Sequence, residues 1–280
     1  MASRRKFIQQ SIAGIGGAAV LPLLGRAGNG SSAKKGDTPL QLGMAGYSFA
    51  KYDVEKSIAI MNRVNVKNLS LKDFHLPLNS SPEKIQSVLA QFAAGGISLY
   101  AVGVIYMKSK EAVDEAFAYA KNVGVSLIVG VPNPELLDYT EEKVKSTNIR
   151  IAIHNHGPED KLYPSPKNVY DLIKDRDPRV GLCIDIGHST RAGQDPAKAV
   201  LEYSKRVFDL HIKDVSAAQK DGKAMEVGRG VIDFGALVKA LNKIKYTGYC
   251  SFEFEKDMSD SLPGIAESEG YFRGVIKTIG

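Results

Sequence analysis

Short apolar runs alternate with amphipathic segments from residue 40 to the end of the chain, and this rhythm restricts the fold more than any other feature. The runs are rich in Val, Ile and Leu, as buried strands are, and the segments between them repeat apolar residues at helical spacing. We expect strands at residues 40–47, 66–71, 98–104, 126–131, 149–154, 180–186, 207–212 and 248–254. We expect helices between them at residues 54–64, 82–94, 110–122, 136–146, 165–174, 196–204 and 233–244.

Eight strands that alternate with helices are typical of one closed barrel. The repeating part of the chain is close in length to the roughly 250 residues of such barrels, so we predict an α/β fold with a single (β/α)8 (TIM) barrel. An open sheet that binds a dinucleotide is disfavoured, because no glycine-rich fingerprint follows the first expected strand. Active sites of these barrels lie at the carboxyl ends of the strands.

The first 37 residues read as an export signal and a linker. Residues 3–8 (SRRKFI) form a twin-arginine pattern, and an apolar stretch follows at 12–24. That stretch is too short to cross a bilayer, which takes about 20 residues, but it suits a signal peptide. A Gly/Ser/Lys linker at 28–37 then leads to the barrel at 38–280. We therefore expect a periplasmic or otherwise exported protein without a stable membrane anchor.

The net charge of +6 comes from this leader. The first 36 residues hold six of the 37 Lys and Arg and no acidic residue, so the other 31 basic residues balance the 31 Asp and Glu. A basic surface that follows a phosphate backbone is therefore not expected, and neither is a nucleic-acid partner.

The last four expected strands share an unusual pattern. Side chains alternate between the two faces of a strand, and in each of these strands one face is apolar while the other ends in His, Asp, Glu or Lys. The apolar faces suit packing against the helices, so the polar groups should point into the mouth of the barrel. In strand order these are His154 and His156, Asp185 with His188 just beyond, His211 and Lys213, and Glu253 and Glu255.

Four of these groups form a set with metal-binding chemistry. His154 and His211 offer imidazole nitrogens, and Asp185 and Glu253 offer carboxylate oxygens. A mixed nitrogen and oxygen set suits Mn, Co, Fe or Zn better than Mg, which prefers oxygen ligands. One histidine at a barrel mouth is often a hydrogen-bonded packing residue. Four ligand types at equivalent heights instead predict one bound divalent metal ion.

Four motifs in this region resemble those of the sugar isomerase and epimerase superfamily with the xylose-isomerase-like barrel. They are HNHG at 154–157, DIGH at 185–188, HIKD at 211–214 and GYCSFE at 248–253. The resemblance implies that Asp185, His211 and Glu253 bind a divalent metal and that His188 contacts the substrate. At the fourth ligand position the superfamily usually has a glutamate, where this chain has His154.

The resemblance implies a metal-dependent sugar isomerase or epimerase, which removes a proton next to a sugar carbonyl and passes through an enediolate. Relatives use two metal-bound carboxylates for this, and His154 replaces one of them here. Glu253 or Glu255 could then act on one side of the substrate, and His156 or His188 on the other. The alternative is a lyase or hydratase acting on keto-sugars or 3-keto-glycosides, for which one base and an activated leaving group suffice.

Several other residues are candidates for substrate binding. Lys213 could bind a substrate oxygen or pair with a carboxylate, and Arg229 lies in a loop that resembles a substrate-contacting loop of the superfamily. His75 follows the second expected strand and could line the mouth. Tyr47 and Tyr106 fall at strand ends, where they could pack on a sugar ring or simply form the rim.

Two functions of other classes remain open. An apurinic endonuclease resembles this fold but uses more metal ligands than a chain with five His residues provides. A non-catalytic sugar-binding barrel would use the same mouth without turnover. In either sugar-related function the partner is a small sugar or keto-sugar, and because superfamily members are often dimers or tetramers, a homo-oligomer is also expected.

Overall fold

The computed structural model describes residues 40–279. The expected signal and linker at 1–37 lie outside this part of the chain. Within residues 40–279, no helix combines the length and the apolarity needed to cross a membrane.

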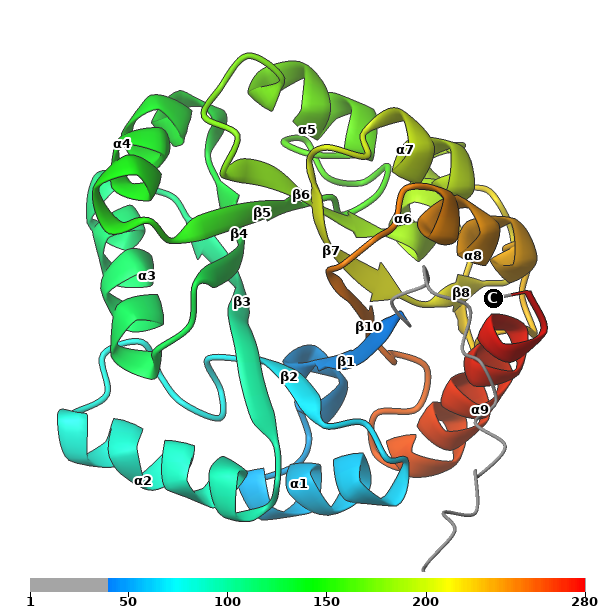
Figure 1. The fold of residues 1–280 in the computed structure, drawn as a ribbon, viewed down its shortest axis with the longest axis horizontal. Coiled ribbons are helices and arrows are strands. Elements are labelled where there is room, and N and C mark those ends of the chain that lie inside the picture. Colours follow the sequence, from blue (N-terminus) through cyan, green and yellow to red (C-terminus); the bar gives the residue numbers. More distant parts are fainter. Residues whose placement is uncertain (1–39, 280) are drawn as a thin grey trace, which may run out of the picture. The chain divides into compact units, whose positions relative to one another are not determined.

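Eight parallel strands close into one barrel, which confirms the predicted fold (Figure 1). Around the barrel the order is β1-β10-β7-β6-β5-β4-β3-β2, so strands next to each other along the chain are also neighbours in space. The barrel strands are β1 (Gln41–Ala45), β2 (Asn68–Leu71), β3 (Ser98–Met107), β4 (Leu127–Pro132), β5 (Arg150–His154), β6 (Val180–Asp185), β7 (Val207–Ile212) and β10 (Tyr249–Phe252). A small antiparallel pair, β8 (Asp214–Val215) and β9 (Ala224–Met225), forms between β7 and the next helix.

Helices surround the barrel, as the amphipathic segments predict (Figure 1). They are α1 (Val54–Arg63), α2 (Pro82–Ala94), α3 (Lys110–Val123), α4 (Leu137–Thr147), α5 (Pro166–Ile173), α6 (Ile186–Arg191), α7 (Pro196–Glu202), α8 (Phe234–Lys243) and α9 (Ser261–Ile279), with short 3-10 turns η1 (Gly46–Phe49) and η2 (Pro134–Leu136). Asp or Ser side chains cap the amino ends of most of them. For example, Asp53 accepts a hydrogen bond from the backbone N–H of Lys56, which satisfies a free donor of α1.

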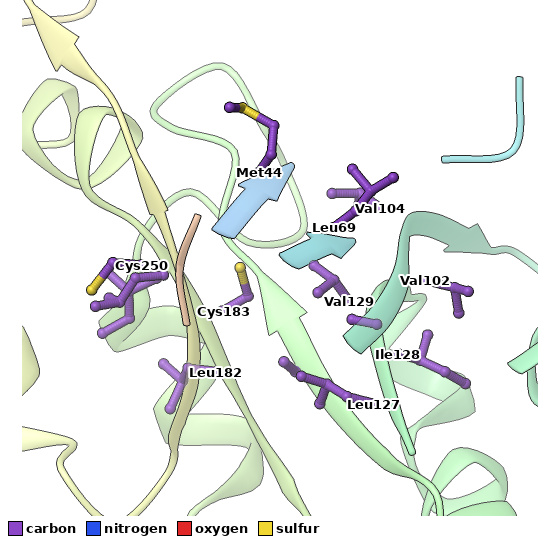
Figure 2. Packing of buried hydrophobic residues seen from close by; sticks show 14 of the residues in the cluster. Met44, Leu69, Val102, Val104, Leu127, Ile128, Val129, Leu182, Cys183 and Cys250 are labelled. Atoms are coloured by element: carbon purple, nitrogen blue, oxygen red, sulfur yellow. The ribbon is translucent and has the colours of Figure 1, made fainter. Parts of the chain in front are cut away.

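The strands contribute to one continuous hydrophobic core. Figure 2 shows part of it, with Met44 on β1 and Leu69 on the neighbouring β2, and Val129 on β4. Cys183 and Cys250 lie fully buried in the same core as free thiols. They fill space there as small apolar side chains do.

Two helices were not among those expected from the sequence. The short helix α6 begins directly after β6, because the Asp185 side chain accepts a hydrogen bond from the backbone N–H of His188 and so starts a helix where the apolar pattern continues to Ile186. The last helix, α9, packs against α8 beside β10. Strand β10 also stops at Phe252, so the two glutamates that follow it lie in irregular backbone at the barrel mouth.

Candidate active site

Four neighbouring strands bring the expected metal ligands together. His154 ends β5, Asp185 ends β6, His211 lies near the end of β7, and Glu253 follows β10 directly. The register places Asp185 opposite His211, and the backbone N–H of Glu253 donates to the carbonyl oxygen of Ile212 on β7. One ligand atom from each of the four residues lies within 4.8 Å of all the others.

The geometry of this cluster fits a divalent ion. His154 Nε2 lies 3.0 Å from His211 Nδ1 and 3.6 Å from Asp185 Oδ2, and His211 Nδ1 lies 3.1 Å from Glu253 Oε2. Within residues 40–279, Asp185 Oδ2 is buried and its contacts are ion pairs, with His154 and with Lys213 Nζ at 3.0 Å, rather than hydrogen bonds. Burial lowers the pKa of His154 to about 4, which keeps its imidazole neutral and able to donate to a metal. His154, Asp185, His211 and Glu253 are therefore the residues that would hold such an ion.

Cys183 offers an alternative third ligand next to the two histidines. Burial raises the pKa of its thiol to about 12, so the thiol keeps its proton at neutral pH. A thiol must lose its proton to bind a metal. With Asp185 and Glu253 the two histidines form a set of four ligands, whereas Cys183 would complete a set of three and would have to lose its proton to the metal.

Lys213 lies in the middle of the acidic groups rather than in the open mouth. Its Nζ is 2.8 Å from Glu253 Oε2, 3.0 Å from Asp185 Oδ2 and 3.1 Å from Glu255 Oε2. Burial alone would lower the pKa of Lys213, but these carboxylates raise it well above its usual value. The sequence left open whether Lys213 binds substrate or pairs with acids, and the structure shows the pairing.

Sequence reasoning did not assign a role to Asn155, which holds β5 and β6 together behind the cluster. Its Oδ1 accepts the backbone N–H of Asp185 at 3.0 Å, and its Nδ2 donates to the Asp185 carbonyl at 3.3 Å. Asn155 is buried, and its position inside the HNHG motif was the available signal. The side chain of Asp185 is fixed in turn by the first turn of α6, where its Oδ1 accepts from the His188 backbone at 2.8 Å.

A cavity of about 330 Å³ opens over the cluster at the carboxyl ends of the strands. Its volume is at the lower end of the range of small-molecule sites. Two ligands, His154 and Glu253, reach its wall. The other lining residues are Tyr47, Lys72, Val104, Tyr106, His156, His188 and Glu255. The structure thus brings His156, His188 and Glu255 together around one cavity, as the alternating pattern predicts, and adds Lys72, which the sequence did not single out.

His156 and Glu255 approach this cavity from different strands. His156 Nε2 is hydrogen-bonded to the Tyr106 hydroxyl at 2.9 Å, and its Nδ1 lies 3.4 Å from Asp160 Oδ2. Burial lowers the pKa of His156, so its ring is neutral near pH 7 and can accept a proton. Burial also raises the pKa of Glu255, although Lys213 opposes this shift.

Two expected substrate contacts lie away from the cavity. His75 is buried below the rim, where its Nε2 is 3.0 Å from the carbonyl oxygen of Tyr52 and 3.2 Å from Ser57 Oγ. Arg229 is exposed and pairs with Glu267 at 2.8 Å. In the described part of the chain neither side chain lines the cavity.

The carboxylate of Asp214 explains the position of Arg229. Its Oδ2 accepts hydrogen bonds from the backbone N–H groups of Gly228 and Gly230, at 3.0 and 2.9 Å. The loop is therefore pinned on both sides of Arg229. This arrangement directs the arginine outward to α9.

Comparison with known proteins places the chain in a family. A family model described as a xylose isomerase-like TIM barrel matches residues 54–273, which is well over half of the chain. The chain therefore belongs to the xylose isomerase-like TIM barrel family.

Curated relatives match shorter stretches. The rhizopine catabolism protein MocC of Rhizobium meliloti is 28% identical over 137 residues, which cover 44% of this chain and 42% of that protein. The inosose dehydratase of Geobacillus thermodenitrificans is 30% identical over 108 residues, which cover 33% of this chain and 36% of that protein. The aligned parts thus span less than half the length of either relative.

Solved structures share the whole barrel at low identity. The zinc-bound structure of the IolI protein has a TM-score of 0.72 at 15% identity and covers 86% of this chain and 99% of that one. The 3-keto-D-glucoside 4-epimerase YcjR of E. coli has a TM-score of 0.68 at 15% identity, covering 84% of this chain and 99% of that one. Proteins similar to this chain therefore include both an epimerase and a dehydratase.

Proposed function

We propose that the protein is a divalent-metal-dependent sugar isomerase or epimerase that removes a proton next to a sugar carbonyl. The observation that carries this proposal is the pair of proton-transfer groups at the cavity above the His154–Asp185–His211–Glu253 cluster. His156 follows β5 and Glu255 follows β10, and β6 and β7 lie between those two strands in the barrel. A ring bound between them presents one face to each group.

Each group has a defined part in this proposal. A divalent ion at the cluster would polarise the carbonyl and make the neighbouring C–H more acidic. Glu255 takes the proton on its side as a carboxylate, and Lys213 next to it stabilises that charged form. On the other side His156 returns a proton from its imidazolium form and becomes neutral, and Tyr106 fixes the orientation of its ring. In the reverse direction neutral His156 takes the proton, and the carboxylic acid form of Glu255 returns one to the opposite face. Return of the proton from the second face gives the epimer, and return to the neighbouring carbon gives the aldose or ketose isomer.

One observation favours a second function, a lyase or hydratase acting on keto-sugars or 3-keto-glycosides. The position where relatives usually carry a second carboxylate holds His154, whose imidazole faces the cluster. Elimination needs one base and a leaving group instead of two matched bases. The similarity to an inosose dehydratase agrees with this alternative.

Proton exchange separates these reactions. The metal-loaded protein is incubated in D2O with a panel of ketoses and 3-keto-glycosides, and the NMR signal of the proton next to the carbonyl is followed. We expect exchange together with a new diastereomer or an aldose. Exchange with release of water or an alcohol would establish the second function. No exchange on any substrate, with the metal confirmed as bound, would contradict both and favour a sugar-binding barrel.

Two variants test the assigned groups. Glu255→Gln and His156→Asn should each lower exchange by about 100-fold, the lower end of what one positioned acid or base contributes. Arg229→Gln is the matched control, because it removes the charge of an exposed side chain outside the cavity and should leave exchange unchanged. Equal exchange in all four proteins would refute these roles.

We also propose that residues 1–37 export the protein through the twin-arginine pathway. The support is the paired arginines Arg4 and Arg5 before an apolar stretch of 13 residues at 12–24. A reporter fused after residue 37 should reach the periplasm, and the double substitution of both arginines by lysine should retain it in the cytoplasm. Export of the double variant would refute the signal.

A further inference from the structure

Three exposed aromatic side chains gather at one side of the barrel mouth. Tyr47 lies in η1 directly after β1, Phe74 follows β2, and Tyr106 lies near the end of β3, and these three strands are neighbours in the barrel (Figure 1). Their exposed fractions are 41%, 41% and 51%. Within residues 40–279, one other aromatic residue, Tyr271 in α9, is as exposed. Such a concentration at a cavity rim is typical of a ligand surface.

Phe74 extends this surface beyond the cavity. Tyr47 and Lys72 line the cavity, whereas Phe74 is outside the lining. The Phe74 ring centre is 6.5 Å from that of Tyr47, and Lys72 Nζ is 5.7 Å from it. Phe74 is therefore joined to the cavity wall through two residues and continues it outward.

Tyr106 belongs to the cavity itself. Its ring stacks on His156 with centres 5.4 Å apart, and its hydroxyl is hydrogen-bonded to the same histidine. Tyr47 and Phe74 have no such tie to the proton-transfer groups in the described structure. Lys72 and His75 cover part of the Phe74 ring, but Tyr47 and Phe74 each keep 41% of their surface exposed, which leaves area for a ligand that projects out of the cavity.

The volume of the cavity limits the size of the ligand that it can hold. A volume of about 330 Å³ is close to the smallest ligand sites, which begin at about 300 Å³. One sugar ring is a reasonable occupant, and any group attached to that ring must extend to the rim. The C–H groups on one face of a pyranose form an apolar patch, and an aromatic ring is a suitable surface for it.

We infer that the substrate is a glycoside whose reacting ring carries the carbonyl and enters the cavity, and whose second sugar ring packs on Tyr47 and Phe74. This inference rests on the proposed function and specifies its substrate class. The two halves of the mouth then have separate tasks. The strands β5, β6, β7 and β10 supply the polar cluster, and the segments after β1 and β2 bind the second ring.

Calorimetric binding of glucose, maltose and cellobiose to the full-length, metal-loaded protein tests the inference without turnover. At least one disaccharide should bind about tenfold more tightly than glucose, the effect of one good aromatic contact. Phe74→Ala should remove this preference and leave glucose binding unchanged. Tyr271→Ala, which removes an equally exposed aromatic ring from α9, is the control and should keep the preference.

Two results would overturn the inference: no preference for either disaccharide, or a Phe74→Ala variant that keeps the preference or weakens glucose and disaccharide equally. The D2O exchange experiment is independent of this measurement. A disaccharide preference without exchange on any substrate would support the surface and contradict the proposed reaction. Proton exchange on a free ketose without tighter binding of either disaccharide would support the proposed reaction and contradict the second-ring surface.

Discussion

Replacement of Lys213 by methionine should strongly destabilise the metal-free protein. The ammonium group lies within 3.1 Å of three carboxylates, and its side chain is 4% exposed. Asp185 and Glu253 are equally buried, at 0% and 5%. Methionine has a similar length and no charge, so the variant takes the ammonium away from two buried carboxylates and leaves the His211 imidazole, 3.1 Å from Glu253 Oε2, as the remaining partner of Glu253.

The size of the effect follows from this burial. Removing one partner of a buried ion pair costs about 3–5 kcal/mol in the free energy of unfolding. Glu255 is 29% exposed, so its pair with Lys213 adds less than about 1 kcal/mol. One kcal/mol shifts the Tm of a domain of this size by about 2–4 °C, so we expect a decrease of roughly 6–20 °C.

Thermal unfolding with and without added Zn²⁺ measures both parts of this prediction. A divalent ion would supply the missing positive charge, so the rise in Tm on adding Zn²⁺ should be larger in Lys213→Met than in the wild type. Arg229→Met is the control, because it breaks an exposed ion pair that contributes less than about 1 kcal/mol. A metal-free Lys213→Met protein that melts within 2 °C of the wild type, a limit of about 1 kcal/mol, would refute this reasoning.

Three further predictions concern the metal, a loop and pH. Removal of the metal from the wild type with a chelator should lower its Tm by several degrees, since an ion at 100 times its Kd stabilises the fold by about 2.7 kcal/mol. The Asp185→Asn variant should instead melt at the same temperature with and without Zn²⁺. Asp214→Ala should cost about 2–3 kcal/mol in urea unfolding, because the backbone N–H groups of Gly228 and Gly230 lose their carboxylate acceptor, and an unchanged midpoint would contradict this. Burial lowers the pKa of His75, so below about pH 6.5 the unfolded chain binds a proton that the folded protein does not. The free energy of unfolding should therefore decrease as the pH drops below this value. The decrease should be less steep in His75→Gln.

The meeting of the four cluster side chains could be predicted from the sequence because two regular patterns determine it. Strand alternation decides which side chains point inward, and a parallel barrel brings the carboxyl ends of all its strands to one mouth. His154, Asp185, His211 and Glu253 all lie within one residue of such an end or just beyond it. Their meeting within 4.8 Å needs no information beyond these patterns.

Loop residues are different, because periodicity does not fix their direction. His75 and Arg229 both follow strands in sequence, yet local hydrogen bonds turn one inward below the rim and the other outward to Glu267. Lys213 shows an intermediate case. Strand alternation predicts that its side chain points inward. Its pairing with three carboxylates depends on the distances at which β6 and β10 place Asp185 and the two glutamates.

The four cluster residues fall between residues 154 and 253, whereas the aromatic rim falls between 47 and 106. Mutations at Tyr47 and Phe74 can therefore alter the rim without replacing any of the four cluster residues, whereas Tyr106 is hydrogen-bonded to His156. Under the proposed function, such a chain can change its substrate preference at the rim while the cluster stays the same. The order of the strands along the gene thus gives the protein one segment that selection can vary and another that it must preserve.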